Sequence, residues 1–261
     1  MATGITVATG ITVAQADEGA SSVSDSQPTE TVIIGVEAGS YFPHYDDSTG
    51  EYEGFGRALL DEFARYAGIE LEYRIHPLKR LAVSAISGQV SLRYPDNPYW
   101  EADLKEGTEI TYSHPIVTYV DGTMVPPNRL GQGLDNFYKL GTVSGFTPWP
   151  YFAAIDEGKI TVSENNSRTG LLHQVLMGRL DGAYLSIVVA NHQLTYGLEQ
   201  PGALIFDPTL PYKKSHYHLS TSTRPDLIRK FNAFLREESA RVVQIKSDYR
   251  VEEGLSFIPD Y

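Results

Sequence analysis

The stretch RYPDNPYW places a cation, a carboxylate, an amide and large aromatic rings within residues 93–100. A guanidinium binds carboxylates bidentately, a carboxylate accepts hydrogen bonds from amines or hydroxyls, and aromatic faces stack on rings or cover cations. We therefore expect Arg93, Tyr94, Asp96, Asn97 and Trp100 to contact a small polar ligand. A loop punctuated by proline and carrying Asp-Asn is also typical of a routine turn, which is the alternative interpretation.

A second candidate is the turn Ser144-Gly-Phe-Thr-Pro148, which lies between a predicted strand and a predicted helix. Thr147 suits the N-cap and Pro148 the first helical position. The free N–H groups of such a turn can receive an anionic or carbonyl group, so Phe146 and Thr147 are expected near the ligand. An ordinary capped helix is the alternative.

Three further residues, Tyr41, Phe42 and Arg168, are candidate contacts. Tyr41 and Phe42 follow the first predicted strand, where their rings can line a pocket or pack between domains. Arg168 begins a predicted helix after Asn165-Asn-Ser167. A cation at a helix N-terminus is unfavourable for the helix dipole, so Arg168 is expected to have an anionic partner nearby.

Metal-dependent and nucleotide-dependent chemistry is not indicated. The chain has no HExxH, GxSxG, P-loop or GxGxxG pattern. His216 and His218 could form a metal site with Asp207, but alternation along a strand explains the pair more simply. No metal and no cofactor is expected.

The composition restricts the class of protein. The 33 acidic and 21 basic residues give a net charge of −12, which argues against a nucleic-acid partner. The absence of cysteine excludes disulfides, thiolate sites and a lipid-modified cysteine. The rest of the composition is typical of a globular protein.

The N-terminus has the pattern of processing. Residues 2–7 and 8–13 repeat ATGITV, and Ala-Gln-Ala follows at 14–16, like the end of a secretory signal and its cleavage site. Residues 1–16 are thus predicted to be a signal-peptide remnant, although no Lys or Arg precedes the apolar part, and residues 17–30 a disordered leader. The predicted location is the periplasm.

The rest of the chain alternates between strand-like and helix-like patterns, which predicts an α/β fold. The first predicted elements are a strand at 31–36, a helix at 55–67, a strand at 69–75 and a helix at 78–86. After an irregular segment at 94–109, the predicted elements are strands at 112–125, 141–144, 161–162, 182–185 and 217–222 and helices at 148–155, 171–177 and 225–246.

Five stretches carry a resemblance to a known family: 32–74, SGQV at 87–90, LGTVSGFTPWPYF at 140–152, MGRLDGAYLS at 177–186 and STRPDLIRKFNAFL at 222–235. In their order they resemble bacterial extracellular solute-binding proteins of the polar-amino-acid type (family 3). The resemblance implies the periplasmic binding protein type II fold, with two lobes joined by two hinge strands. It places residues 31–116 and 212–261 in lobe 1 and residues 117–211 in lobe 2.

The chain departs from the family at both charged anchors of a free α-amino acid. By spacing, Asp103 occupies the position of the arginine that clamps the α-carboxylate. Counting from Asp181, the position of the aspartate that holds the α-ammonium is occupied by Ser186. Asp181 and Tyr184 remain expected ligand contacts, but a standard amino acid is doubtful as the ligand.

The expected function is capture of a small polar solute for a membrane permease of the ABC type, by a protein expected to be monomeric and not an enzyme. One alternative is a sensor or regulatory module of the same fold. A less favoured alternative is a dehydratase-like enzyme with Asp96, His44 or His114 as acid and base.

Overall fold

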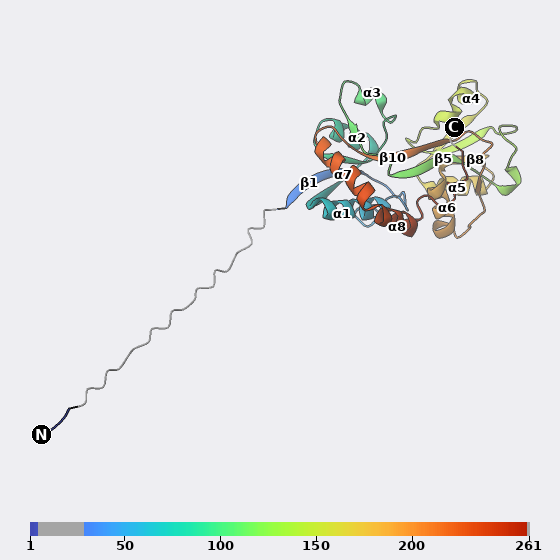
Figure 1. The fold of residues 1–261 in the computed structure, drawn as a ribbon. Coiled ribbons are helices and arrows are strands. Elements are labelled where there is room, and N and C mark those ends of the chain that lie inside the picture. The colour runs from blue at the N-terminus through green and yellow to red at the C-terminus, as the bar shows by residue number, and fades with distance from the viewer. Residues whose placement is uncertain (5–28, 260–261) are drawn as a thin grey trace.

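The computed structural model describes residues 1–4 and 29–259. The predicted signal segment and leader lie outside the described residues, except for residues 1–4, 29 and 30. The described part forms two lobes that lie side by side and are connected by long strands (Figure 1).

The elements alternate along the chain as the sequence predicts. The strands are β1 (Glu30–Glu37), β2 (Ile69–His76), β3 (Leu92–Asp96), β4 (Thr111–Tyr112), β5 (Val117–Val125), β6 (Lys139–Val143), β7 (Thr161–Asn165), β8 (Gly182–Ser186), β9 (Ile205–Phe206) and β10 (Lys213–Thr221). The helices are α1 (Phe55–Ala67), α2 (Leu78–Ile86), α3 (Ala102–Lys105), α4 (Phe152–Asp156), α5 (Arg168–Leu176), α6 (Ile187–His192), α7 (Pro225–Glu237) and α8 (Ser239–Tyr249), with short helical turns η1 (Pro127–Arg129), η2 (Trp149–Tyr151) and η3 (Gln193–Gly197).

One sheet passes through both lobes, in the order β2-β1-β3-β10-β5-β8-β6-β7. In the first lobe β1 is parallel to β2 and β3, and in the second lobe β6 is parallel to β7 and β8. Strands β5 and β10 are antiparallel to each other and to their neighbours. The parallel strands of each lobe thus end at the region where the lobes meet, which is where open α/β sheets place their ligands.

The first lobe is organised around β1 and the helices α1 and α7. Phe63 of α1 packs edge-to-face on Phe231 of α7 with ring centroids 5.0 Å apart, and Phe234 lies 5.9 Å from Phe63. Helix α1 ends at Gly68, which has φ 68° and ψ 38° and so takes the left-handed conformation that glycine adopts without strain. Full burial of these rings provides most of the stabilisation between the two helices.

The second lobe packs α5 and α6 on β5, β6 and β8. Leu171, Leu172 and Val175 form the buried face of α5. Helix α5 approaches β6 so closely that a Cβ on Gly141 would lie 2.4 Å from Leu171 Cδ1 and 2.6 Å from Leu180 Cδ1. This position therefore requires glycine for close packing of the helix on the sheet.

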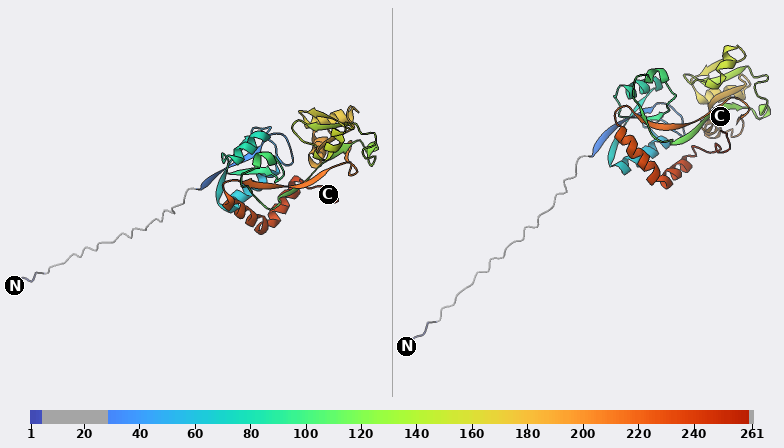
Figure 2. Two further views of the ribbon diagram at one scale, coloured as in Figure 1. Left: turned by 90° about the horizontal axis from the view of Figure 1, so that it is seen from above. Right: turned by 45° about the horizontal axis from the view of Figure 1, so that its top comes forward.

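Strand β5 contributes side chains to both lobes, and β10 pairs with it along the crossing. In β5, Val117 and Tyr119 join the first hydrophobic core, whereas Val120 and Met124 join the second. The ladder between the two strands runs from the pair Val117–Tyr217 to the pair Asp121–Lys213. Both views in Figure 2 show these strands crossing between the lobes.

The C-terminal segment also spans the two lobes. After α8, Val251 packs in the first core, whereas Leu255 and Ile258 pack in the second. The segment binds the crossing strands, since Glu252 Oε1 accepts from the Thr118 N–H at 2.6 Å and the Ile258 carbonyl accepts from Lys214 Nζ at 2.7 Å. The predicted lobe boundaries stay a prediction.

Two helix predictions, 55–67 and 78–86, are confirmed to the residue. The prediction of one helix over 225–246 is wrong, because the chain turns at Glu238 between α7 and α8. Both helices contact α1, so the turn keeps their apolar faces on one curved surface.

Three other local predictions are wrong. The predicted strand 112–125 is interrupted between β4 and β5, where Pro115 cannot donate a ladder hydrogen bond. Part of the predicted irregular segment 94–109 is ordered as the end of β3 and as α3. Thr147 does not cap a helix, since the helical turn begins at Trp149 with no side-chain cap.

The described residues include no helix that is both long enough and apolar enough to span a lipid bilayer.

We expect Gly141→Ala to lower the free energy of unfolding by about 1–3 kcal/mol, because the new methyl group overpacks the contact with Leu171 and Leu180. Urea unfolding measures the change. The double variant Gly141→Ala/Leu171→Val removes one clashing methyl and should recover part of the loss; no recovery would contradict this account of the packing.

Candidate functional site

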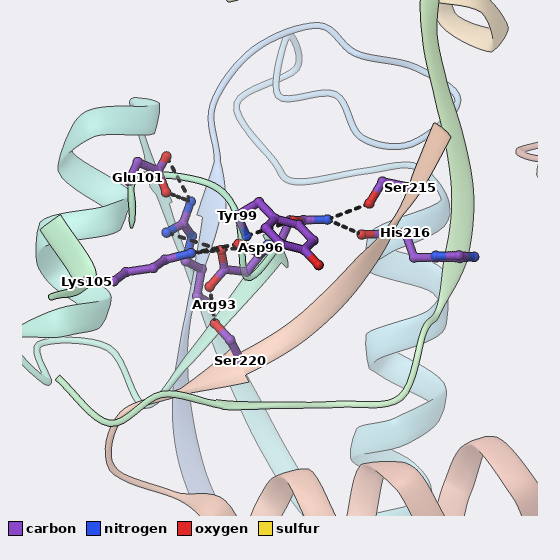
Figure 3. Close-up of polar contacts among 9 residues, drawn as sticks. Arg93, Asp96, Tyr99, Glu101, Lys105, Ser215, His216 and Ser220 are labelled. Atoms are coloured by element: carbon purple, nitrogen blue, oxygen red, sulfur yellow. Dashed lines mark hydrogen bonds and ion pairs between the residues drawn. The ribbon is translucent and has the colours of Figure 1, made fainter. Parts of the chain in front are cut away.

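Strand β3 and the segment that follows it form a buried ion-pair network (Figure 3). Arg93 is 1% exposed and binds Glu101 through Nη2 at 3.0 Å and Asp96 through Nη1 at 3.5 Å. Lys105 Nζ donates to Asp96 Oδ1 at 2.9 Å, and the Ser220 hydroxyl donates to Asp96 Oδ2 at 2.6 Å. Two cations therefore share two carboxylates, and the charges of these four side chains cancel.

Asn97 connects the same segment to strand β10 through side-chain hydrogen bonds. Its Nδ2 donates to Ser215 Oγ at 3.0 Å and to the His216 carbonyl at 2.9 Å, and its Oδ1 accepts from the Tyr99 N–H at 3.0 Å. Tyr94 is fully buried in the first hydrophobic core, beside Gly56 of α1.

These contacts favour a structural role for most of the residues predicted to contact a ligand in RYPDNPYW, namely Arg93, Tyr94, Asp96 and Asn97. Arg93 and Asp96 are fully buried and already bind protein groups, so ligand contact through them would require breaking ion pairs. Trp100 differs, because its ring is partly exposed and lies 5.7 Å from Tyr217 and 6.0 Å from Tyr119.

The lobes meet through Arg168 and Tyr41. Nη1 of Arg168, at the start of α5, donates to the Ser40 carbonyl of the first lobe at 2.7 Å. The same guanidinium lies over the ring of Tyr41, with Cζ 4.7 Å from its centroid. The partners of this cation are thus a carbonyl dipole and an aromatic face. Beside them, Phe42 packs on His192 of the second lobe at 4.7 Å.

A cluster of aromatic rings extends from Tyr41 towards the crossing strands. Tyr119 of β5 and Tyr217 of β10 are diagonal neighbours in the ladder, and their rings stack at 4.5 Å with an interplanar angle of 20°. His44 packs edge-on against Tyr217 at 5.2 Å and stacks on Tyr41 at 5.8 Å. The predicted contacts Tyr41 and Trp100 therefore belong to one aromatic group at the lobe junction.

Asp121 of β5 lies among these rings. Its Oδ1 is buried and has no hydrogen-bond partner. Burial raises the pKa of Asp121 to about 8, so its carboxyl group is largely protonated at neutral pH. Burial also raises the pKa of four neighbouring phenols, and the charged form of Asp121 adds to the shift in Tyr41, Tyr119, Tyr184 and Tyr217.

Two further ionisable groups border the cluster. Burial raises the pKa of Glu37, at the end of β1, and the nearby Tyr45 hydroxyl and Arg168 guanidinium oppose the shift. His44 is fully buried with neither ring nitrogen hydrogen-bonded, and burial lowers its pKa to about 3. The imidazole is therefore neutral at physiological pH.

The remaining predicted contacts separate into two groups. Tyr184 and Phe146 pack together at 5.9 Å, and Tyr184 is close to Asp121, so both border the junction from the second lobe; Thr147 follows Phe146 in the same turn. Asp181 lies at the opposite end of β8, where its Oδ2 accepts from the N–H groups of Tyr138 and Lys139 at 2.8 Å. That contact aligns the starts of β6 and β8.

Four residues at the junction are not among the contacts predicted from the sequence: Asp121, Glu37, Tyr119 and Tyr217. The signal for Asp121 was present, because VTYVDGTMV puts a single carboxylate inside an otherwise apolar strand. A charge in such a position is either paired or functional.

The positions considered for metal or acid–base chemistry do not converge. In the part of the chain that the structure describes, no three His, Asp or Glu side chains are placed to hold a metal ion. Asp96 is committed to its ion pairs, His44 lies in the aromatic cluster, and His114 is exposed. Over the described ranges, no hydrogen bond joins any two of these three enzyme candidates.

No protein-family model and no curated protein matches the chain. Solved structures do match it in fold. A histidine kinase sensor domain with similarity to periplasmic binding proteins has a TM-score of 0.67 at 16% identity, over 85% of this chain and 96% of that one. The arginine-, lysine-, histidine-binding protein ArtJ from Geobacillus stearothermophilus has 0.64 at 19%, over 84% and 95%.

The ancestral amino acid-binding protein AncCDT-1, a precursor of cyclohexadienyl dehydratase, has a TM-score of 0.63 at 16% identity, over 84% of this chain and 94% of that one. Most of these neighbours are binding proteins. The expected two-lobed α/β fold of type II periplasmic binding proteins is therefore confirmed.

We expect Asp96→Ala to lower the free energy of unfolding by about 3–5 kcal/mol, because it leaves Lys105 and Arg93 buried with fewer carboxylate partners. Glu157→Ala is the control, since its ion pair with Lys159 is exposed (57% and 72%) and its loss should cost less than about 1 kcal/mol. Equal losses in the two variants, measured by urea unfolding, would contradict the structural role.

We expect Asp121→Asn to stabilise the protein in a pH-dependent way. The pKa of Asp121 is raised from about 4 in the unfolded chain to about 8 in the folded one, so the folded state keeps a proton that the unfolded state loses. Stability from this group is therefore complete below about pH 4 and is lost as the pH rises to about 8.

Asparagine does not ionise, so the advantage of the variant should grow across that range. The difference in the free energy of unfolding between the variant and the parent protein should reach several kcal/mol, because each unit of pKa difference corresponds to about 1.4 kcal/mol. Urea unfolding of both proteins at about pH 5 and about pH 9 measures it, and a difference that does not change with pH would refute the burial of this carboxyl group.

Proposed function

We propose that this protein is a solute-binding protein of the periplasm, which captures a small polar molecule between its lobes and delivers it to an ABC-type permease. The fold supports this proposal, and so do the binding proteins among its structural neighbours. We also propose that the lobes have the predicted limits, 31–116 with 212–261 and 117–211, and that β5 and β10 act as the hinge.

The observation that carries the proposal is the group of unsatisfied polar atoms where the lobes meet. Asp121 Oδ1, Ser186 Oγ and both ring nitrogens of His44 are buried without hydrogen-bond partners. A buried polar group without a partner costs about 1–3 kcal/mol, so native proteins keep such groups where another molecule supplies the partner. A ligand at the junction would supply it here.

The contacts of Arg168 support closure as the mechanism. This residue of the second lobe binds the Ser40 carbonyl and the Tyr41 ring, which both belong to the first lobe. Such contacts exist only when the lobes are together, so they and the ligand favour the same closed state.

The proposed solute is not a standard α-amino acid. Asp103 stands where the family arginine would bind the α-carboxylate, and it lies on α3 beside Lys105 and Glu106. Arg93, the nearest guanidinium in sequence, is buried and occupied by Asp96 and Glu101. We propose no enzymatic activity, because the acid–base candidates do not come together.

A sensor module is the second candidate function, and the similarity to a histidine kinase sensor domain favours it. The same ligand site and closure would then bias a membrane receptor. The two functions differ in the partner that recognises the closed form.

Differential scanning fluorimetry against amines, betaines, sugars, carboxylates and amino acids tests the proposal. A solute at 100 times its Kd should add about 2.7 kcal/mol to the free energy of unfolding. Small-angle X-ray scattering should show a smaller radius of gyration with the same solute. If no compound stabilises the protein, the proposed function is wrong.

We expect Arg168→Ala to weaken solute affinity by roughly 5- to 30-fold, which corresponds to about 1–2 kcal/mol lost from the closed state. Scattering from the solute-free variant should show a larger radius of gyration than that of the parent protein. Arg179→Ala, another arginine of the second lobe whose side chain is exposed, is the control and should change neither quantity.

A further inference from the structure

Two polar side chains without hydrogen-bond partners lie opposite each other at the lobe junction. Ser186 ends β8, its side chain is 1% exposed, and its hydroxyl has no partner. In the antiparallel ladder between β5 and β8, the residue opposite Ser186 is Asp121, whose Oδ1 also has no partner. Directly opposed residues have Cβ atoms about 4.5–5.5 Å apart on the same face, so the two side chains are neighbours on that face.

We propose that the lobe junction binds the head group of a small organic ammonium ion, with Asp121 as its counter-ion and the surrounding tyrosine rings as its walls. This inference rests on the proposed function and specifies the class of solute.

The aromatic surroundings suit a cation. Tyr41, Tyr119, Tyr184 and Tyr217 come from a loop and from three different strands, and all four are near enough to Asp121 for its charge to raise their pKa. Aromatic faces attract ammonium groups, and a desolvated contact is worth about 2 kcal/mol. The Tyr41 ring already receives the guanidinium of Arg168.

The protein itself does not neutralise Asp121. On β10, Lys213 lies opposite Asp121, but its ammonium group is directed to the ring of Tyr99, 5.9 Å from the centroid. Desolvation alone accounts for the pKa of Asp121, with no contribution from a nearby cation. Asp121, the central residue of the row Lys213–Asp121–Ser186, thus has no cationic partner among the described side chains.

An anionic solute fits the same residues poorly. Glu37 and Asp121 both border the cluster, so a carboxylate there would be repelled by their ionised forms and would disfavour the ionisation of both groups. Arg93 is held by Asp96 and Glu101, and Arg168 is held by Ser40 and Tyr41.

The test titrates the protein with methylammonium and with tetramethylammonium, and with acetate and glucose as anionic and neutral probes. Fluorescence of Trp100 and of the tyrosine cluster reports binding. We expect saturable binding of at least one ammonium ion and none of acetate or glucose. Binding of methylammonium alone would identify a hydrogen-bonded amine, and binding of tetramethylammonium a quaternary ammonium.

Asp121→Asn should weaken this binding by about 30-fold or more, because the cation loses its buried counter-ion. Lys213→Met and Arg179→Ala are the controls, since the Lys213 ammonium group is directed to the Tyr99 ring and the Arg179 side chain is exposed. Each should change affinity by less than about threefold, which corresponds to under about 0.7 kcal/mol. The double variant Asp121→Ser/Ser186→Asp moves the carboxylate from β5 to the opposite position on β8, and it should bind the ammonium ion more tightly than Asp121→Asn does. Such a recovery would show that the site requires a carboxylate at the junction and does not require it at position 121.

Ammonium binding must also release a proton from Asp121 at neutral pH. Affinity should therefore rise up to tenfold per pH unit below the pKa of about 8, and calorimetry in buffers of different ionisation enthalpy should detect the proton. Lys213, Ser186 and the four tyrosines face Asp121, and the raised pKa values of those phenols keep them from titrating in this range. Asp121→Asn should abolish the release.

The outcomes separate the two proposals. If acetate, glucose or another uncharged or anionic solute binds and the ammonium ions do not, or if Asp121→Asn binds cations as well as the parent does, the ammonium proposal is overturned and the proposed function stands. If neither these probes nor the solutes of the wider screen bind, both proposals fall.

Discussion

The structure depends on the antiparallel ladder between β5 and β10. The ladder is the backbone connection between two separate hydrophobic cores, and its hydrogen bonds make one sheet of two. Strand β5 alternates its side chains and passes from one core to the other, so Tyr119 packs in the first core and Val120 in the second. Asp121 lies on β5 between Tyr119 of the first core and Met124 of the second, so it faces the junction between the lobes.

Two carboxyl groups, those of Asp96 and Asp121, have different surroundings. Asp96 is surrounded by Arg93, Lys105 and a serine hydroxyl, which compensate its desolvation. Asp121 Oδ1 has no hydrogen-bond partner, and desolvation leaves the group mainly protonated at neutral pH. The first arrangement stabilises β3 and the segment after it. The second lowers the stability of the folded protein, as functional sites often do.

The fold by itself does not choose among transport, sensing and catalysis, since its structural neighbours include a sensor domain and a precursor of a dehydratase. The side chains at the junction are more informative. Arg168 on Tyr41 links the lobes, and the tyrosines around Asp121 form a surface suited to a cation. The chemistry of these residues therefore narrows the range of solutes further than the fold does.

Local sequence patterns predicted much of the fold. Apolar residues at helical spacing placed α1 and α2 correctly because each helix has one buried face and ends at a Gly or Ser-Gly stop. The same pattern could not show the turn at Glu238, since the apolar spacing continues from Phe234 to Val242 and Ile245 across it. That turn depends on the shape of the surface beneath it.

The candidate site divides in the same way. Tyr41, Trp100 and Arg168 were predictable, because aromatic and cationic residues stood next to strand ends and helix starts. Arg93 and Asp96 had equally suggestive residue types, but their partners Glu101, Lys105 and Ser220 come from other parts of the chain and bury them.

The sequence by itself thus determined the order of most strands and helices and the type of fold. Only the tertiary structure decided which charges are paired and which have no partner among the described residues. The physical reason is that helix and strand patterns arise from neighbours in sequence, whereas the pairing of Asp121 with Ser186 and the tyrosines depends on residues that the sheet brings together from distant positions.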